Sequence, residues 1–158
     1  SQLFSESGQT LLEAIIALAT AVVIISAMTV IVISSLNNAQ FSRNQNQATQ
    51  YAQQGIEIMK NISQSNWAAF ASLPSGSYCL SQDSTTLIPK GTDCGQNVGI
   101  FSRGIDISQN STSCTPSTSL VTVIVSWSDS KCTSAIDPYC HKIKLVSCIY
   151  NSTSISPP

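Results

Sequence analysis

A long hydrophobic run covers residues 11–33, which are almost wholly apolar and include no proline or glycine. At 1.5 Å per residue, a helix over residues 11–34 would be about 36 Å long, enough to cross the roughly 30 Å hydrocarbon core of a bilayer. A single segment in lipid must be helical, because only a helix or a closed barrel satisfies the backbone there. The pattern therefore predicts one membrane-inserting helix, followed by a polar domain.

The next stretch, residues 35–62, keeps a helical pattern but becomes amphipathic. Its apolar and small residues recur at three- and four-residue intervals: Ala48, Tyr51, Ala52, Gly55, Ile56 and Met59. The opposite face is rich in amides: Asn37, Asn38, Gln45, Gln47 and Gln53. We expect this part of the helix to leave the membrane and pack its apolar stripe on a sheet. A coiled-coil stalk would need sustained heptads and flanking charges, which are missing.

Residues 63–99 form a loop-rich connector punctuated by proline and glycine. We expect Trp67, Phe70 and Leu73 to close the end of the helix against the domain. We therefore expect the strands of the sheet to lie after residue 99, in about the last third of the chain.

Strand patterns follow in residues 100–107, 120–127 and 141–150. Their alternation implies one buried face, so we expect three or more antiparallel strands packed on the helix. The predicted fold class is α+β: a long N-terminal hydrophobic helix packed at its C-terminal half on an antiparallel β-sheet, with disulfides.

Glu13 is the one charge inside the hydrophobic run. A carboxylate in an apolar helix is costly and usually has a partner. Thr10 and Glu13 have the spacing of a capping box, in which Thr10 caps the helix. Alternatively, Glu13 meets a cation from another copy of the chain.

The sequence Gly8-Gln9-Thr10-Leu11-Leu12-Glu13, followed by a long apolar run, resembles the N-terminus of type IV pilins and the related pseudopilins. The resemblance implies that a prepilin peptidase cuts between Gly8 and Gln9, that the new amine is methylated, and that Glu13 is the fifth mature residue. Gln9 departs from the commoner phenylalanine at the first mature position. Residues 48–57 also resemble the second half of a pilin helix, and residues 101–107 with 121–127 look like the sheet of bacterial pilin-like proteins.

This resemblance divides the chain into four parts. Residues 1–8 would be the leader tail, 9–36 the transmembrane and filament-core helix, 37–62 its amphipathic half, and 63–158 the globular β-sheet head domain. Many family members carry a proline midway along the first helix.

No proline precedes Pro74 in this chain, so we expect a mostly continuous helix. Any local unwinding would arise at Thr20, Ser26 or Thr29. Basic residues on the cytoplasmic flank orient a membrane helix, and we expect them upstream of Ser1, since Arg43 lies on the far side.

Charged residues make up only 9% of the 158-residue chain, and the net charge is −1. A nucleic-acid partner held through phosphate contacts requires a basic patch, and Lys131, Lys142 and Lys144 are the only local cluster. A DNA-uptake pilin is therefore disfavoured, and no nucleic-acid partner is predicted.

Six cysteines, all after residue 78, indicate disulfides formed outside the cytoplasm. Cys79 and Cys94 flank one loop and are suggested partners. We favour pairing Cys132 with Cys140 and Cys114 with Cys148, although six cysteines allow fifteen pairings and the sequence cannot choose.

No catalytic, cofactor or metal site is predicted. His141 is the only histidine, and a Cys–His nucleophile pair with Cys140 would also need a third orienting group. Asp106, Asp129 and Asp137 are scattered, so a calcium site has no support. Three asparagines begin glycosylation triplets, which arise readily by chance in a chain rich in Ser, Thr and Asn: Asn61, Asn110 and Asn151.

These observations predict a structural subunit of an extracellular type IV pilus-like helical filament, with roles in adhesion and motility. In it, the amine of Gln9 on one subunit would pair with Glu13 of a neighbour and fix the register. Apolar side chains would supply most of the cohesion: Leu11, Leu12, Ile15, Ile16, Leu18, Val22 and Ile25.

The expected partners are identical subunits, the prepilin peptidase and the pilus assembly machinery. The subunit would wait in the cytoplasmic membrane before it reaches the cell-surface filament. A pseudopilin of a type II secretion system or a minor pilin would have the same physics. A membrane-anchored enzyme is the alternative from a different functional class, and it is disfavoured because the sequence shows no catalytic motif.

Overall fold

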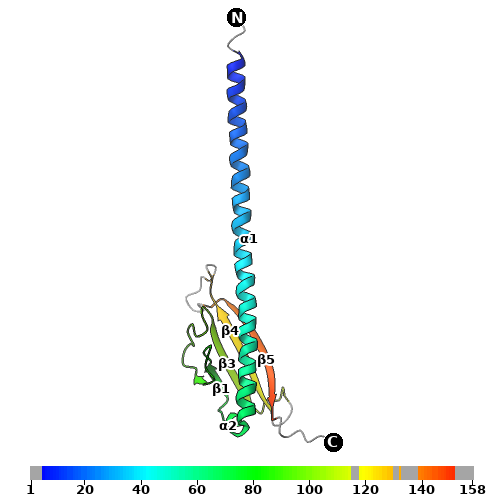
Figure 1. The fold of residues 1–158 in the computed structure, drawn as a ribbon, viewed down its shortest axis with the longest axis vertical. Helices are drawn as coiled ribbons and strands as arrows, with labels where there is room; N and C mark the ends of the chain where they lie inside the picture. The colour runs from blue at the N-terminus through cyan, green and yellow to red at the C-terminus, as the bar shows by residue number, and fades with distance from the viewer. Residues whose placement is uncertain (1–4, 115–117, 130–131, 133–138, 152–158) are drawn as a thin grey trace, which may run out of the picture. The chain divides into compact units, whose positions relative to one another are not determined.

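The computed structural model describes residues 5–114, 118–129, 132 and 139–151, with side chains from Thr10 onward. The chain divides into two compact units, residues 1–44 and 45–158. Helix α1 (Ser5–Ser65) is unbroken over 61 residues (Figure 1). This continuity agrees with the lack of proline in the segment and confirms the expectation of a continuous helix.

A short second helix, α2 (Trp67–Ala71), follows α1 directly. Asn66 caps it, because its Oδ1 accepts a hydrogen bond of 3.0 Å from the Ala69 backbone N–H. Phe70 is 1% exposed, and Trp67 and Leu73 pack against the same hydrophobic core. The three apolar residues therefore close the end of α1 as expected, although the sequence analysis missed that two of them lie in or beside a helix.

The remaining described elements are strands β1 (Gly76–Cys79), β2 (Ile88–Pro89), β3 (Ser102–Gln109), β4 (Thr118–Trp127) and β5 (His141–Tyr150). They form one antiparallel sheet in the order β2-β1-β3-β4-β5 (Figure 1). The long helix, the antiparallel sheet and three disulfides confirm the predicted α+β, disulfide-containing fold. β1 and β2 were expected to be loop, because four- and two-residue strands carry little periodic signal.

β3 begins at Ser102, two residues later than the strand pattern suggested. Val98 and Phe101 exchange backbone hydrogen bonds of 3.0 and 3.1 Å across a tight turn, in which Gly99 has a φ of +60°. Left-handed φ values favour glycine, so this position directs the chain into the turn. Ile100 consequently lies at the exposed tip of the turn instead of in the strand.

The core of residues 45–158 lies between the amphipathic stripe of α1 and one face of the sheet. Ala48, Ala52 and Met59 are fully buried, as the helical periodicity predicted. Alternate residues of β3 and β4 meet them from the sheet: Ile105, Ile107, Val121, Val123, Val125 and Trp127. Each strand therefore has one buried face and one face turned away from α1.

Arg103 lies in this apolar face and is fully buried. Its Nε donates to the Leu80 carbonyl at 3.0 Å and its Nη2 to the Ser81 carbonyl at 2.7 Å. Its Nη1 donates to the Tyr51 carbonyl of α1 at 3.2 Å and to Gln54 Oε1 at 3.1 Å. One side chain of β3 thus connects α1 to the loop after β1.

Burial lowers the pKa of the Arg103 guanidinium below its ordinary value, while Tyr51 and Asp83 offset part of this effect. The group stays charged, because arginine does not deprotonate in proteins. Its hydrogen bonds to carbonyl oxygens replace the water that the charge loses.

Gly55 marks the closest approach of α1 to the sheet. A Cβ built there would lie 2.9 Å from Val123 Cγ1 and 3.5 Å from Arg103 Cδ. Valine is stiff at χ1 and cannot easily turn its methyl away. The absence of a side chain at this position therefore allows the helix to reach Arg103.

We predict that Gly55→Ala destabilises the head domain by about 1 kcal/mol, because overpacking outweighs the gain of about 1 kcal/mol in helix propensity. In a Val123→Ala background the same change should be neutral or stabilising. Denaturant titrations of the full chain in detergent micelles, followed by tryptophan fluorescence, would measure this cycle. Additive effects of the two substitutions would show that the close contact does not limit residue 55.

We predict that Arg103→Met destabilises the domain by about 2–4 kcal/mol, because it removes the four hydrogen bonds by which Arg103 joins β3 to α1 and to the loop after β1. Arg103→Lys should recover only part of this loss, since one ammonium lacks the fork of donors that reaches both elements. The same titration would measure both variants. Lys144→Met, at an exposed position of β5, is the control and should change stability by less than about 0.5 kcal/mol.

Candidate functional site

The first unit, residues 1–44, contains the most apolar surface among the described residues. The successive residues Val22, Val23, Ile24 and Ile25 are 54%, 68%, 54% and 63% exposed, so the helix is apolar on every face. The seven residues predicted to pack between helices are all more than half exposed: Leu11, Leu12, Ile15, Ile16, Leu18, Val22 and Ile25. A helix that is hydrophobic all round requires lipid or other helices as its surroundings.

Within the described residues, α1 is the one helix long and apolar enough to cross a membrane. None of its most apolar stretch is buried against the rest of the chain. The segment is therefore consistent with insertion into a membrane.

Three hydroxyl side chains in the apolar segment bond to the helix that carries them. Thr20 Oγ1 donates to the Ala17 carbonyl at 2.9 Å. Ser26 Oγ and Thr29 Oγ1 each donate at 2.8 Å to the carbonyl four residues earlier. Because these hydroxyls find acceptors inside the helix, they can enter an apolar environment without losing a hydrogen bond.

Glu13 is exposed on α1, and its carboxylate makes no hydrogen bond or ion pair with any described residue. α1 begins at Ser5, so Thr10 lies inside the helix and the capping box considered from the sequence does not form in this structure. The carboxylate thus remains an isolated charge within an apolar surface. Such a group is costly in lipid unless a partner reaches it.

Gly8 and Gln9, the residues of the predicted cleavage point, lie in α1. Gln9 precedes Glu13 by four residues, which is about one helical turn. The side chain of Gln9 is outside the described part of the chain. Cleavage after Gly8 and methylation of the new amine stay predictions.

The second unit carries three disulfides: Cys79–Cys94, Cys114–Cys148 and Cys132–Cys140. These are the pairings that the sequence analysis favoured. They hold the segments before and after the strands to the sheet, and closing a loop of about 15 residues in this way contributes about 3 kcal/mol. Because every cysteine is bonded, none is available as a nucleophile.

One cluster of metal-binding residue types lies at the start of β5. Ligand atoms of Asp129, Cys132, Cys140 and His141 all lie within 4.8 Å of one another. His141 Nε2 is 3.0 Å from Asp129 Oδ2, and the imidazole packs on Trp127 with ring centroids 5.4 Å apart. Sequence reasoning missed this pairing, which follows from the register that sets Trp127 opposite His141.

The chemistry of this cluster depends on its sulfurs. Two cysteines, a histidine and an aspartate could form a tetrahedral zinc site only if the cysteines were thiolates. The Cys132–Cys140 disulfide leaves two ligands, His141 and Asp129, which are too few for a structural zinc site. The pair instead joins the end of β4 to the start of β5.

The remaining candidate residues from the sequence, the aspartates and the glycosylation asparagines, do not come together in one site among the described residues. Asp106 accepts a hydrogen bond of 2.6 Å from Ser77 Oγ, and Asp137 lies outside the described residues. Of the three glycosylation triplets, Asn61 is exposed on α1, Asn110 is exposed after β3 with a φ of 54°, and Asn151 is half-buried after β5. Their glycosylation stays a prediction.

We predict that the oxidised chain binds Zn²⁺ no more tightly than a pair of isolated ligands would, with a dissociation constant weaker than micromolar. Competition against a zinc-sensitive dye, with the chain in detergent micelles, would measure it. His141→Asn is the matched variant. Tight one-to-one binding that His141→Asn removes would contradict the interpretation of the cluster as a structural pair.

No family model matches this chain, and no curated protein or solved structure shows significant similarity to it. The architecture, a long apolar N-terminal helix whose second part packs on an antiparallel sheet, is compatible with a pilin-like fold.

Proposed function

We propose that this chain is a pilin, the structural subunit of an extracellular type IV pilus-like helical filament assembled through its N-terminal helices. One observation carries the proposal: residues 11–33 of α1 are apolar on every face, and the Glu13 carboxylate among them has no partner among the described residues. The Gly8-to-Glu13 sequence supports it, because it resembles the processing site of that family.

The hydrophobic effect does not distinguish the membrane from the filament core. Burying a leucine, isoleucine or valine side chain is worth about 1.5–3 kcal/mol in water, but lipid tails are as apolar as a bundle of helices. Packing must therefore favour the bundle, and small residues such as Ala14, Ala17 and Ala21 permit the close approach of helices that it needs.

Glu13 supplies the difference between the two environments. In lipid the carboxylate would be isolated, whereas in a bundle the free amine of a neighbouring Gln9 would pair with it. The cut after Gly8 creates this amine, so a subunit could pair only after processing. An incoming subunit out of register would leave the carboxylate unpaired, which gives the pair a role in registry.

The head domain suits exposure outside the cell. Three disulfides fasten its sheet, and disulfides form outside the cytoplasm. In this proposal the subunit waits in the cytoplasmic membrane, the prepilin peptidase and the assembly machinery act on it, and the filament at the cell surface serves adhesion and motility. Contacts of this head-to-tail kind are heterologous and propagate into a helix.

We predict that Glu13→Ala reaches the membrane at normal levels but lowers the yield of surface filaments by roughly tenfold or more, because the register-setting pair is lost. Electron microscopy of sheared surface fractions, normalised to the membrane content of the subunit, would measure the yield. Glu57→Ala is the control, since Glu57 is an exposed glutamate in the second unit of the same helix.

N-terminal sequencing of the same filaments should begin at methylated Gln9. Normal filament yield from Glu13→Ala would refute the pairing mechanism. Filaments that are short or rare in the unaltered cells would favour the alternative, a pseudopilin of a type II secretion system or a minor pilin, which uses the same helix.

A further inference from the structure

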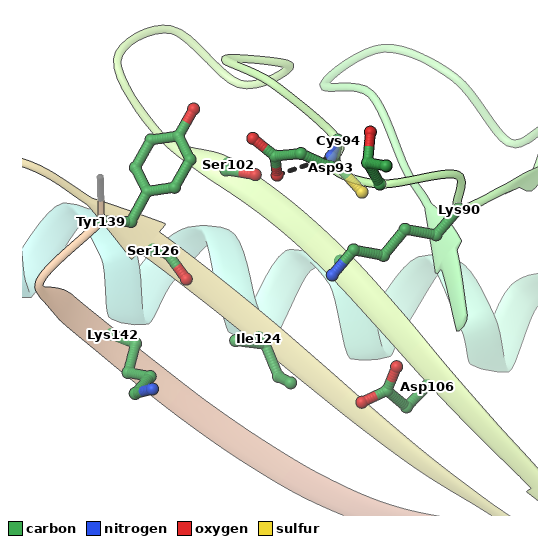
Figure 2. A pocket seen from close by; sticks show the side chains of 11 residues that line it. Lys90, Asp93, Cys94, Ser102, Asp106, Ile124, Ser126, Tyr139 and Lys142 are labelled. Carbon is green, nitrogen blue, oxygen red and sulfur yellow. Dashed lines mark hydrogen bonds between the residues drawn. The ribbon is translucent and has the colours of Figure 1, made fainter. Parts of the chain in front are cut away.

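A cavity of about 330 Å³ opens on the sheet face turned away from α1 (Figure 2). Its floor comes from alternate residues of β3 and β4, and its walls come from the loop before Cys94 and from the start of β5. Ser102 pairs with Ser126 and Gly104 with Ile124 across the two strands, while Ser126 pairs with Lys142 of β5. The register thus gathers residues from three strands at one place.

Gly104 makes the floor hollow. A Cβ built there would lie 3.8 Å from the Tyr78 carbonyl oxygen and 4.0 Å from Cys94 Sγ, both ordinary contacts. Its φ is not in the left-handed region, so neither packing nor backbone conformation requires glycine. The missing side chain instead leaves space above the sheet.

Of the charged side chains around the cavity, the two aspartates accept hydrogen bonds, whereas the two lysines have no partner among the described residues. Asp106 Oδ1 accepts a hydrogen bond of 2.6 Å from Ser77, and Asp93 Oδ1 accepts one of 2.7 Å from the Cys94 N–H. The side-chain ammonium groups of Lys90 and Lys142 form no ion pair or hydrogen bond with any described residue. The positive charges are therefore available to an anionic group in the cavity.

Two serine side chains add hydroxyl groups to the cavity. Ser102 is only 7% exposed, lines the cavity, and has no side-chain hydrogen-bond partner among residues 5–114, 118–129, 132 and 139–151. Ser126 lies beside it and is also without such a partner in the described structure. These hydroxyl groups are therefore available to a polar ligand in the cavity.

Tyr139 contributes a phenol and an aromatic edge to the wall (Figure 2). Burial raises the pKa of this phenol, and the neighbouring Asp93 carboxylate raises it further. The hydroxyl therefore stays protonated at ordinary pH. The wall thus combines a polar tip with an apolar ring.

We propose that this cavity binds one residue of an acidic saccharide, a sugar ring that carries a carboxylate. The carboxylate would take the charge-assisted hydrogen bonds of Lys90 and Lys142. The sugar hydroxyls would pair with Ser102, Ser126 and the free oxygens of the two aspartates. The cavity volume is at the small end of the range for ligand sites, which fits a single ring.

Other ligand classes leave part of this site unused. A neutral sugar offers nothing to the lysines, and a simple anion offers no hydroxyl groups to the serines. A nucleic-acid backbone would bring phosphates against Asp93 and Asp106, and like charges repel. The proposal does not depend on filament assembly, because every residue it uses belongs to the second unit.

The test is a titration of the ¹⁵N-labelled full chain in detergent micelles with sodium D-glucuronate, followed by amide chemical shifts. We expect shifts confined to residues around the cavity, such as Gly104 and Cys94, and a dissociation constant on the order of 1 mM. Methyl glucoside and sodium acetate, each of which has half of the required groups, should bind about tenfold more weakly.

Variants separate the pocket from general charge attraction. Lys142→Met should weaken glucuronate binding about tenfold, because one charge-assisted hydrogen bond is lost. Lys144→Met is the matched control: it lies two residues along β5 on the same face, outside the cavity, and should change binding by less than about twofold. Gly104→Val should fill the floor and abolish binding in a folded chain.

Three outcomes would overturn the proposal. The first is that glucuronate causes no localised chemical-shift changes. The second is that acetate or methyl glucoside binds as tightly as glucuronate. The third is that Lys142→Met and Lys144→Met weaken glucuronate binding equally. If Gly104→Val fails to fold, the comparison of Lys142→Met with Lys144→Met still decides the test. Both lysines are exposed, so we expect both variants to fold.

Discussion

The head domain depends on one buried cation. Arg103 extends from β3 into an otherwise apolar core and places its guanidinium against carbonyl oxygens of α1 and of the loop after β1. A charge in that position is tolerable only if its donors are occupied, so helix, strand and loop must meet at one point. Gly55 allows the helix to come close enough. This polar contact gives the apolar packing a defined register, which apolar surfaces alone specify weakly.

The same helix serves two environments along its length. In the second unit its apolar stripe is buried against the sheet, whereas in residues 11–33 apolar side chains cover the whole circumference and stay exposed. A surface of the second kind is stable only in lipid or among other helices. Glu13 then becomes the decisive residue of the proposed filament, because it is the one charged group in residues 11–33 and would find a cationic partner only in a bundle that supplies an amine.

The sheet also divides its two faces between different tasks. The face toward α1 is mostly apolar and contains Arg103, whereas the opposite face has the serines, lysines and aspartates that surround a cavity. The period of two along β3 assigns Arg103 and Ile105 to the first face and Ser102 and Gly104 to the second. Folding and the proposed saccharide recognition can therefore change independently, since neighbouring residues of one strand serve each.

Hydrophobic periodicity was enough to predict the long helix, its amphipathic second half and the three long strands, because it reports directly on which face is buried. The sequence also pointed to Glu13, since a single charged residue within an apolar run can be recognised without a structure. Features that depend on contacts between distant residues could not be predicted in this way. They are the short strands β1 and β2, the burial of Arg103, the pairing of His141 with Asp129, and the cavity above Gly104. These features have no local pattern, because strand register and helix docking bring their parts together from positions far apart in the chain.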